Sequence, residues 1–382
     1  MVELADDGEK IRWSVVLAAI DPRESKMNWL LLVIPVAAYF SMVEHNQPLA
    51  FLTSMVAIMP LAYLMGRATE EFALRTSEAV GGLLNATFGN APELIIAALA
   101  IVAAAASITA GDQESADTLV HIVQASLIGS ILGNLLLVLG LAFVWGGIHH
   151  KVQEFNDTQV GANGSLLLLA VIALILPTTY HMSGGTESQV LRLSHATAVV
   201  LMLLYGLFLL FQFRTHTELF ATDGTHEEEP TMRKREAMLL LLSSTAFIAW
   251  MAEILVHSVE AAGDEWGLPT VFIGVILLPM FGNAAEHFTA VTVAGKDKMD
   301  LSFAIAVGSS TQIAIFVAPL MVLLAWVIGV PLSFEFGLLE TIATFLAVLI
   351  TNAIAADGKS NWLEGTMLLV TYALLAMTFS LG

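Results

Sequence analysis

The stretch Phe88-Gly89-Asn90-Ala91-Pro92-Glu93 returns in the second half of the chain as Phe281-Gly282-Asn283-Ala284-Ala285-Glu286, with five of its six residues unchanged. Each copy lies within a long apolar stretch and ends on a glutamate. A carboxylate inside a membrane helix costs roughly 2.5–3.5 kcal/mol or more, so it usually faces a polar cavity and has a function. The repeat therefore indicates two related halves, each with one functional glutamate.

The composition around the two copies is that of a membrane protein. Hydrophobic residues make up 57% of the 382 residues and charged residues only 13%, whereas soluble domains carry about 25% charged residues. The charges gather between apolar stretches of about 20 residues, the length of a helix that crosses a hydrocarbon core. We therefore expect an all-α membrane protein of about eleven transmembrane helices, with the lipid bilayer as its partner. The net charge of −19 argues against nucleic acid, which needs a basic surface.

Eleven spans can be placed along the chain, and they divide into two halves. We expect them at 28–44, 48–66, 81–108, 118–146, 158–178, 190–213, 237–261, 269–294, 301–329, 336–355 and 361–381. Residues 1–47 then hold the N-terminus and one extra helix, 48–213 and 237–382 hold five helices each, and 214–236 form an acidic linker. The two motifs fall in the third and eighth spans, which enter the membrane from opposite faces. Two five-helix repeats of inverted topology are typical of secondary transporters.

Loop charges predict the orientation. Of the 15 lysines and arginines, all except Arg192 fall on one side of this arrangement. The positive-inside rule makes that side cytoplasmic, so we expect the N-terminus inside and the C-terminus outside. The basic residues on the inner side are Lys10, Arg12, Arg23, Lys26, Arg67, Arg75, Lys151, Arg214, Arg233, Lys234, Arg235, Lys296, Lys298 and Lys359.

The residues around each glutamate are suited to building a cation site. Glycine, asparagine and proline are poor residues for a helix interior, so the backbone there is expected to unwind and to offer carbonyl oxygens. Carboxylates, amides and carbonyls are the hard oxygen ligands that calcium prefers, and the chain has no cysteine for a soft metal. The alternative is that the glutamates only tie helices together. The helix-breaking residues are Gly89, Asn90, Pro92, Pro279, Gly282 and Asn283.

The fourth and ninth spans offer further ligands. Gln124 and Ser126 lie in the fourth span, and Ser309, Ser310 and Gln312 lie in the ninth. A glutamine side chain within a membrane span needs a hydrogen-bond partner or an ion to offset the cost of burial. The two glutamines are therefore better candidates for ligands than the serines. Small and hydroxyl residues also serve close helix packing, and that role remains an alternative for each serine.

Weaker candidates lie elsewhere. His287 follows Glu286 and could relay protons near neutral pH, or it could be a structural histidine. Glu253 in the seventh span could line an ion or proton path. Glu227, Glu228 and Glu229 in the linker could sense cations, and the alternative is an ordinary solvated linker.

The paired Gly-Asn-x-x-Glu motifs, with Gln124 and Gln312 one helix further on, resemble the calcium/proton antiporter family of the calcium:cation antiporter superfamily. The stretches Gly81–Thr87 and Lys296–Leu301 are similar to that family as well, and the resemblance runs from about residue 48 to the C-terminus. It implies that Glu93 and Glu286 bind the cation in turn and take protons when it leaves. It also implies glutamines beside the site, an acidic segment between the halves and a prokaryotic plasma membrane. Pro92 departs from the family pattern.

The resemblance implies calcium/proton exchange without cofactor, nucleotide or covalent chemistry. A sodium/calcium exchanger, or an exchanger of another divalent cation, would share the repeat but should show more hydroxyl or carboxylate ligands. A cation channel should show a continuous polar face, whereas these spans are apolar except near the motifs. An enzyme is disfavoured because the chain has neither a His-Glu-x-x-His nor a Gly-x-Ser-x-Gly motif.

Overall fold

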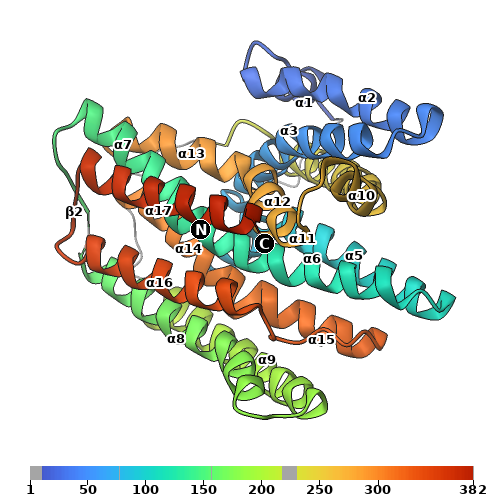
Figure 1. The fold of residues 1–382 in the computed structure, drawn as a ribbon. Coiled ribbons are helices and arrows are strands. Elements are labelled where there is room, and N and C mark those ends of the chain that lie inside the picture. Colours follow the sequence, from blue (N-terminus) through green and yellow to red (C-terminus); the bar gives the residue numbers. More distant parts are fainter. Residues whose placement is uncertain (1–10, 77, 156, 217–229, 382) are drawn as a thin grey trace.

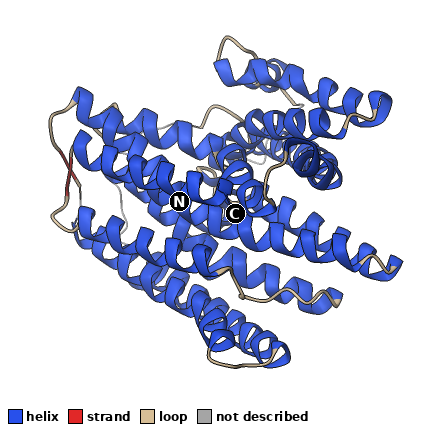
Figure 2. Cartoon of the chain, in the orientation of Figure 1, coloured by secondary structure: helices blue, strands red, loops and turns tan. Residues whose placement is uncertain are grey.

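The computed structural model describes residues 11–76, 78–155, 157–216 and 230–381. In this part of the chain almost every residue is helical, and the long helices run side by side in similar directions (Figures 1 and 2). Glu227, Glu228 and Glu229 of the linker lie outside the described residues.

The first half contains α1 to α9, interrupted by short 3-10 and π-helical turns labelled η. Their bounds are α1 Trp13–Ala19, η1 Lys26–Leu32, α2 Val33–Tyr39, η2 Phe40–Glu44, α3 Gln47–Ala73, α4 Glu78–Phe88, α5 Ala91–Ala110, α6 Gln113–Leu132, η3 Gly133–Val138, α7 Leu139–His149, α8 Asp157–Met182, α9 Glu187–Leu210 and η4 Phe211–Thr215.

The second half contains α10 to α17. Their bounds are α10 Lys234–Trp266, α11 Thr270–Phe272, η6 Ile273–Leu277, α12 Leu278–Gly282, α13 Ala284–Ala294, α14 Met299–Gln312, η7 Ile313–Val317, α15 Ala318–Ile328, α16 Leu338–Ala355 and α17 Trp362–Leu381.

The described helices account for the predicted spans. Ten of them are long and apolar enough to cross a membrane, and the bent pair Thr270–Gly282 and Ala284–Ala294 makes an eleventh. The all-α membrane fold is therefore confirmed. Several helices continue past the predicted ends: α3 extends to Ala73, so Arg67 lies within a helix and not in a loop. Hydropathy marks only the part of a helix in hydrocarbon, and polar residues can continue it beyond that layer.

The described chain contains one small sheet, which the sequence analysis did not predict. Strands β1 (Gln153–Glu154) and β2 (Lys359–Ser360) pair antiparallel at one end of the bundle, beside the ends of α7 and α16 (Figure 1). Lys359 Nζ lies 3.1 Å from Glu154 Oε1. The pair joins the first half to the second on the basic face.

The two long helices α3 and α10 pack along each other, and an ion pair joins the N-terminal segment to the start of α10. Glu236, in the first turn of α10, is fully buried and accepts hydrogen bonds from Nε and Nη2 of Arg12 at 2.9 and 2.8 Å. Glu71 of α3 accepts hydrogen bonds from the backbone N–H groups of Thr231 and Met232. The end of α3 is therefore bound to the segment that leads into α10.

Candidate functional site

Both motifs break a helix at the same point. In the first, α4 ends at Phe88 and α5 begins at Ala91; in the second, α12 ends at Gly282 and α13 begins at Ala284, with a bend of 58°. Asn90 and Asn283 occupy the breaks with nearly equal backbone angles, φ −101° and −91°, ψ 19° and 7°. Pro92 lies in the first turn of α5, where proline is tolerated because the N–H it lacks would have no helical partner. The departure at Pro92 therefore fits the helix break.

The backbone at the two helix breaks makes more hydrogen bonds than the sequence analysis predicted. The backbone oxygens of Asn90 and Asn283 accept hydrogen bonds from the N–H groups of Leu94 and His287 at 3.0 and 2.9 Å. Each of these two oxygens thus already takes part in the following helix and keeps one lone pair for a further interaction. Side-chain oxygens must supply more of any cation site.

Glu93 and Glu286 lie in the first turns of α5 and α13 and line one cavity of about 650 Å³. A Cβ built on Gly89 would lie only 3.8 Å from Glu286 Oε1, so the second glutamate reaches the backbone of the first motif. In each carboxylate Oε2 is buried without a hydrogen-bond partner among the described residues. A buried acceptor without a partner is costly, and a cation or a proton would relieve that cost.

A polar network joins the first motif to α14. The side chain of Asn90 donates from Nδ2 to Gln312 Oε1 at 2.7 Å and accepts from Ser309 Oγ at 3.0 Å. Both partners line the same cavity as the glutamates. Asn283 lines the cavity too and is 1% exposed, but both its amide atoms lack a partner within the described chain.

The sequence analysis did not single out Arg67 and Glu70 of the cavity lining, nor the buried Asn134, which is outside that lining. Arg67 and Glu70 of α3 line the cavity, although Arg67 had been counted as a loop residue. Asn134 lies in the π-helical turn η3, is 1% exposed, and has no partner for either amide atom among the described residues. Single-turn π-helices often mark functional sites, and an asparagine in the middle of an apolar span was the signal that could have found it.

Several predicted residues lie elsewhere. Gln124 donates from Nε2 to the backbone oxygen of Ser333 at 2.9 Å, in the segment before α16. Ser126 and Ser310 donate to backbone oxygens of their own helices, those of Val123 and Ala306. These side chains do not line the cavity.

The two candidates for a proton path are also outside the cavity lining. Glu253 is exposed on the outside of α10. The Nε2 atom of His287 is buried and has no hydrogen-bond partner in the described part of the chain. His287 is the next residue after Glu286. Successive side chains on a helix differ in direction by about 100°, so His287 is directed away from the cavity.

The cavity opens towards the basic face. The lining residues away from the glutamates are Gly66, Arg67, Glu70, Gln212, Phe213 and Leu301. They lie near the helix ends that lead to Arg75, Arg214 and Lys298.

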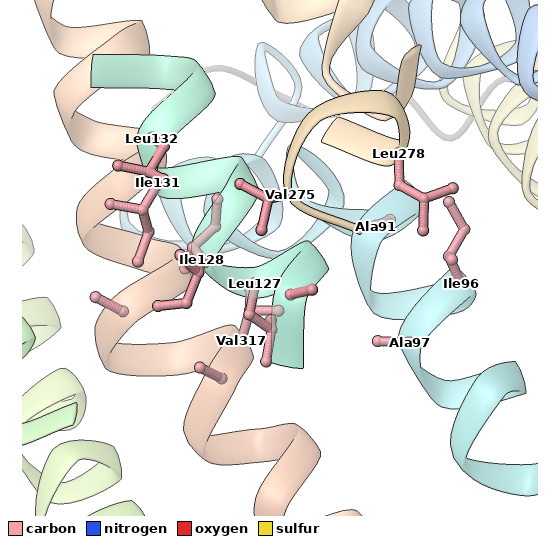
Figure 3. Close-up of a cluster of buried hydrophobic side chains, with 14 of the residues drawn as sticks. Ala91, Ile96, Ala97, Leu127, Ile128, Ile131, Leu132, Val275, Leu278 and Val317 are labelled. Carbon is pink, nitrogen blue, oxygen red and sulfur yellow. The ribbon is translucent and has the colours of Figure 1, made fainter. Parts of the chain in front are cut away.

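Apolar side chains fill the space on the other side of the glutamates. There Leu278 of α12 packs over Ala91 and Ile96 of α5, and Val275 lies beside Ile128 of α6 (Figure 3). All five are buried. This apolar cluster therefore packs beside α5 and α12, the helices next to the two motif breaks.

Two carboxylates and nearby amide oxygens form a sparse set of ligands. Among the described residues no group of three or more histidine, cysteine, aspartate or glutamate side chains could hold a metal ion. A bound cation would therefore depend on Glu93 and Glu286 together with neutral oxygens of side chains and water. Calcium accepts such mixed oxygen ligands in flexible geometry.

Comparisons with known proteins find a matching family model, similar sequences and a similar solved structure. The family model "Sodium/calcium exchanger protein" matches residues 46–214 and 236–381. The chain is 44% identical to a Ca²⁺/H⁺ antiporter of Aphanothece halophytica, over 92% of this chain and 95% of the relative. It is 43% identical to a Ca²⁺/H⁺ antiporter of Synechocystis, over 93% and 97%. A crystal structure of the Ca²⁺/H⁺ antiporter protein YfkE superimposes with a TM-score of 0.75 at 35% identity, covering 97% and 99% of the two chains.

Proposed function

Because this chain belongs to the sodium/calcium exchanger protein family, we propose that it is a secondary transporter that exchanges calcium ions for protons. The observation that carries the proposal is the shared cavity of Glu93 and Glu286, formed where two half-helices of opposite direction begin. The full-length relatives named Ca²⁺/H⁺ antiporter support the choice of ions.

The chemistry follows from competition for the two carboxylates. One calcium ion between them, or a proton on each, neutralises the buried charge. The empty site keeps two uncompensated charges in a region of low dielectric constant, and this disfavours movement of the protein without cargo. Calcium flow in one direction is thereby coupled to proton flow in the other. Calcium and protons are substrates, and no cofactor enters the scheme.

We assign the cation site to Glu93 and Glu286, with Asn90, Ser309 and Gln312 as the polar support of the first motif. Asn283, with its unpartnered amide in the same cavity, is the corresponding group of the second motif. At Gly89 a Cβ would lie only 2.7 Å from the backbone oxygen of Asn85, so glycine is needed there, whereas the space around Gly282 is open. Gln124, Ser126 and Ser310 have no part in this assignment, because their hydrogen bonds lie elsewhere.

The basic face is taken to be cytoplasmic, in a prokaryotic plasma membrane, by the positive-inside rule. In this orientation the cavity opens to the cytoplasm. The described ends of the linker, residues 214–216 and 230–236, lie on the same side.

Transport by purified protein in liposomes tests the function. Vesicles with an acidic lumen should accumulate radioactive calcium from an alkaline medium, and a protonophore should abolish the uptake. A sodium/calcium exchanger would instead follow a sodium gradient at constant pH, and a channel would run down the calcium gradient without either. Uptake driven by sodium alone would overturn the proton-coupled proposal.

A further inference from the structure

Two opposite charges lie along the cavity wall on α3. Arg67 and Glu70 line the cavity that contains Glu93 and Glu286. Gly66, beside them, has no heavy atom within 4 Å of a Cβ built on it. This part of α3 therefore faces open space and not a packed neighbour, and the field of its charges acts directly on ions in the cavity.

The order of these charges follows from the direction of α3. The helix runs from Gln47 to Ala73, and Arg75 at the basic face follows its end. With a rise of about 1.5 Å per residue, Arg67 lies about 4.5 Å deeper than Glu70. A cation that enters from the basic face therefore passes a negative charge, then a positive charge, before it reaches Glu93 and Glu286.

We propose that Arg67 sets the affinity of the site for cations that arrive from the basic face, an inference that rests on the proposed function. A guanidinium stays charged at all physiological pH values, so it repels every cation in the cavity. Repulsion grows with the charge of the ion, and the low-dielectric walls of a cleft concentrate the field. Arg67 thus raises the inner calcium concentration at which the exchanger becomes occupied.

The expected size follows from Coulomb's law. For a positive charge about 10 Å from a dication, with an effective dielectric constant of about 40–60, Coulomb's law gives binding weakened about tenfold. A proton carries half the charge, so the binding of each proton weakens about threefold. The change in calcium affinity should therefore equal the square of the change in proton affinity.

Equilibrium calcium binding tests this in the full-length protein in nanodiscs, by isothermal titration calorimetry at constant alkaline pH and low ionic strength. Arg67→Gln should tighten calcium binding about tenfold and Arg67→Glu about a hundredfold, whereas Arg67→Lys should match the wild type. Arg235→Gln is the matched control, because it removes one exposed charge from the same face outside the cavity. At high salt the differences between the variants should shrink, since ions screen the field.

The outcomes separate this inference from the proposed function. If the wild-type protein neither binds calcium nor exchanges it for protons, the proposed function fails. If the wild type does both but Arg67→Gln and Arg67→Glu keep its calcium affinity, the role of Arg67 is refuted. Equal changes in Arg67→Lys and Arg67→Gln would also refute it, because they would follow from lost packing and not from charge.

Discussion

The side-chain amide of Asn90 donates a 2.7 Å hydrogen bond to Gln312 Oε1 and so joins the first half of the chain to the second. Asn283, which holds the corresponding position in the other motif, makes no such bond within the described chain. Two motifs of nearly the same sequence are therefore inequivalent in this conformation. The asymmetry matches a cavity that opens to one face only.

Removing either glutamate's charge should abolish exchange. Glu93→Gln and Glu286→Gln keep the size of the side chain but cannot hold both a dication and a proton. Each variant should insert and fold, and should lose calcium/proton exchange almost completely. Transport is measured in liposomes and normalised to folded protein. Glu154→Gln is the control, because its carboxylate is 76% exposed and pairs only with Lys359 at the surface. Substantial exchange by either motif variant would contradict the assigned site.

Gln312→Ala should weaken calcium binding through Asn90. The variant removes a hydrogen bond worth about 1 kcal/mol and leaves the amide of Asn90 less fixed. A double-mutant cycle with Asn90→Ala, read out as calcium affinity, measures the coupling. Gln124→Ala is the matched control: it removes the bond to Ser333, so it should lower thermal stability and leave calcium affinity unchanged. Additive effects of Gln312→Ala and Asn90→Ala would show that their contact does not support the site.

Calcium binding should weaken as the pH falls. Ligand carboxylates must lose their protons to bind a metal, so each calcium ion displaces protons from Glu93 and Glu286. With two carboxylates, the logarithm of the dissociation constant should rise by at most about two units per unit fall in pH. Titrations at several pH values give this slope. A constant affinity across the pH range in which exchange operates would exclude direct competition.

Arg12→Gln should destabilise the protein without changing the site. Glu236 is fully buried, and Arg12 donates to it through Nε, Nη2 and its backbone N–H. Loss of the guanidinium removes charge-assisted hydrogen bonds worth about 1.5–3 kcal/mol each at most. The midpoint of thermal unfolding in detergent should fall by several degrees, whereas Arg235→Gln should leave it unchanged. An unaltered midpoint for Arg12→Gln would show that this contact contributes little.

Single cysteines should confirm the orientation, since the native chain has none. Asp112→Cys and Asp264→Cys, both at exposed residues, should react with an impermeant thiol reagent from outside the cell. Lys359→Cys, at an exposed residue of β2, should react only after permeabilisation. Gln153, on the neighbouring strand, is unsuitable because it is 1% exposed and bonded to Asp297. The reverse labelling pattern would place the cavity mouth outside.

The sequence alone determined the spans and the duplicated motif whose copies end on Glu93 and Glu286. These features are local: an apolar stretch long enough to cross a bilayer is helical almost regardless of its neighbours, since the backbone must satisfy its own hydrogen bonds in lipid. A carboxylate in such a stretch stands out without any knowledge of packing. The same locality explains why the helix ends were less accurate, as with α3, which continues to Ala73.

Only the tertiary structure decided which polar side chains meet the glutamates. Gln312 and Gln124 are alike in sequence context, yet one contacts Asn90 in the cavity and the other holds Ser333. The sequence analysis placed Arg67 in a loop, whereas in the structure it lines the cavity. Which face of a helix turns inward depends on contacts with helices far away in the chain, and a few positions along the helix change both depth and direction. Spacing in the sequence cannot contain that information, because it arises when the two halves pack.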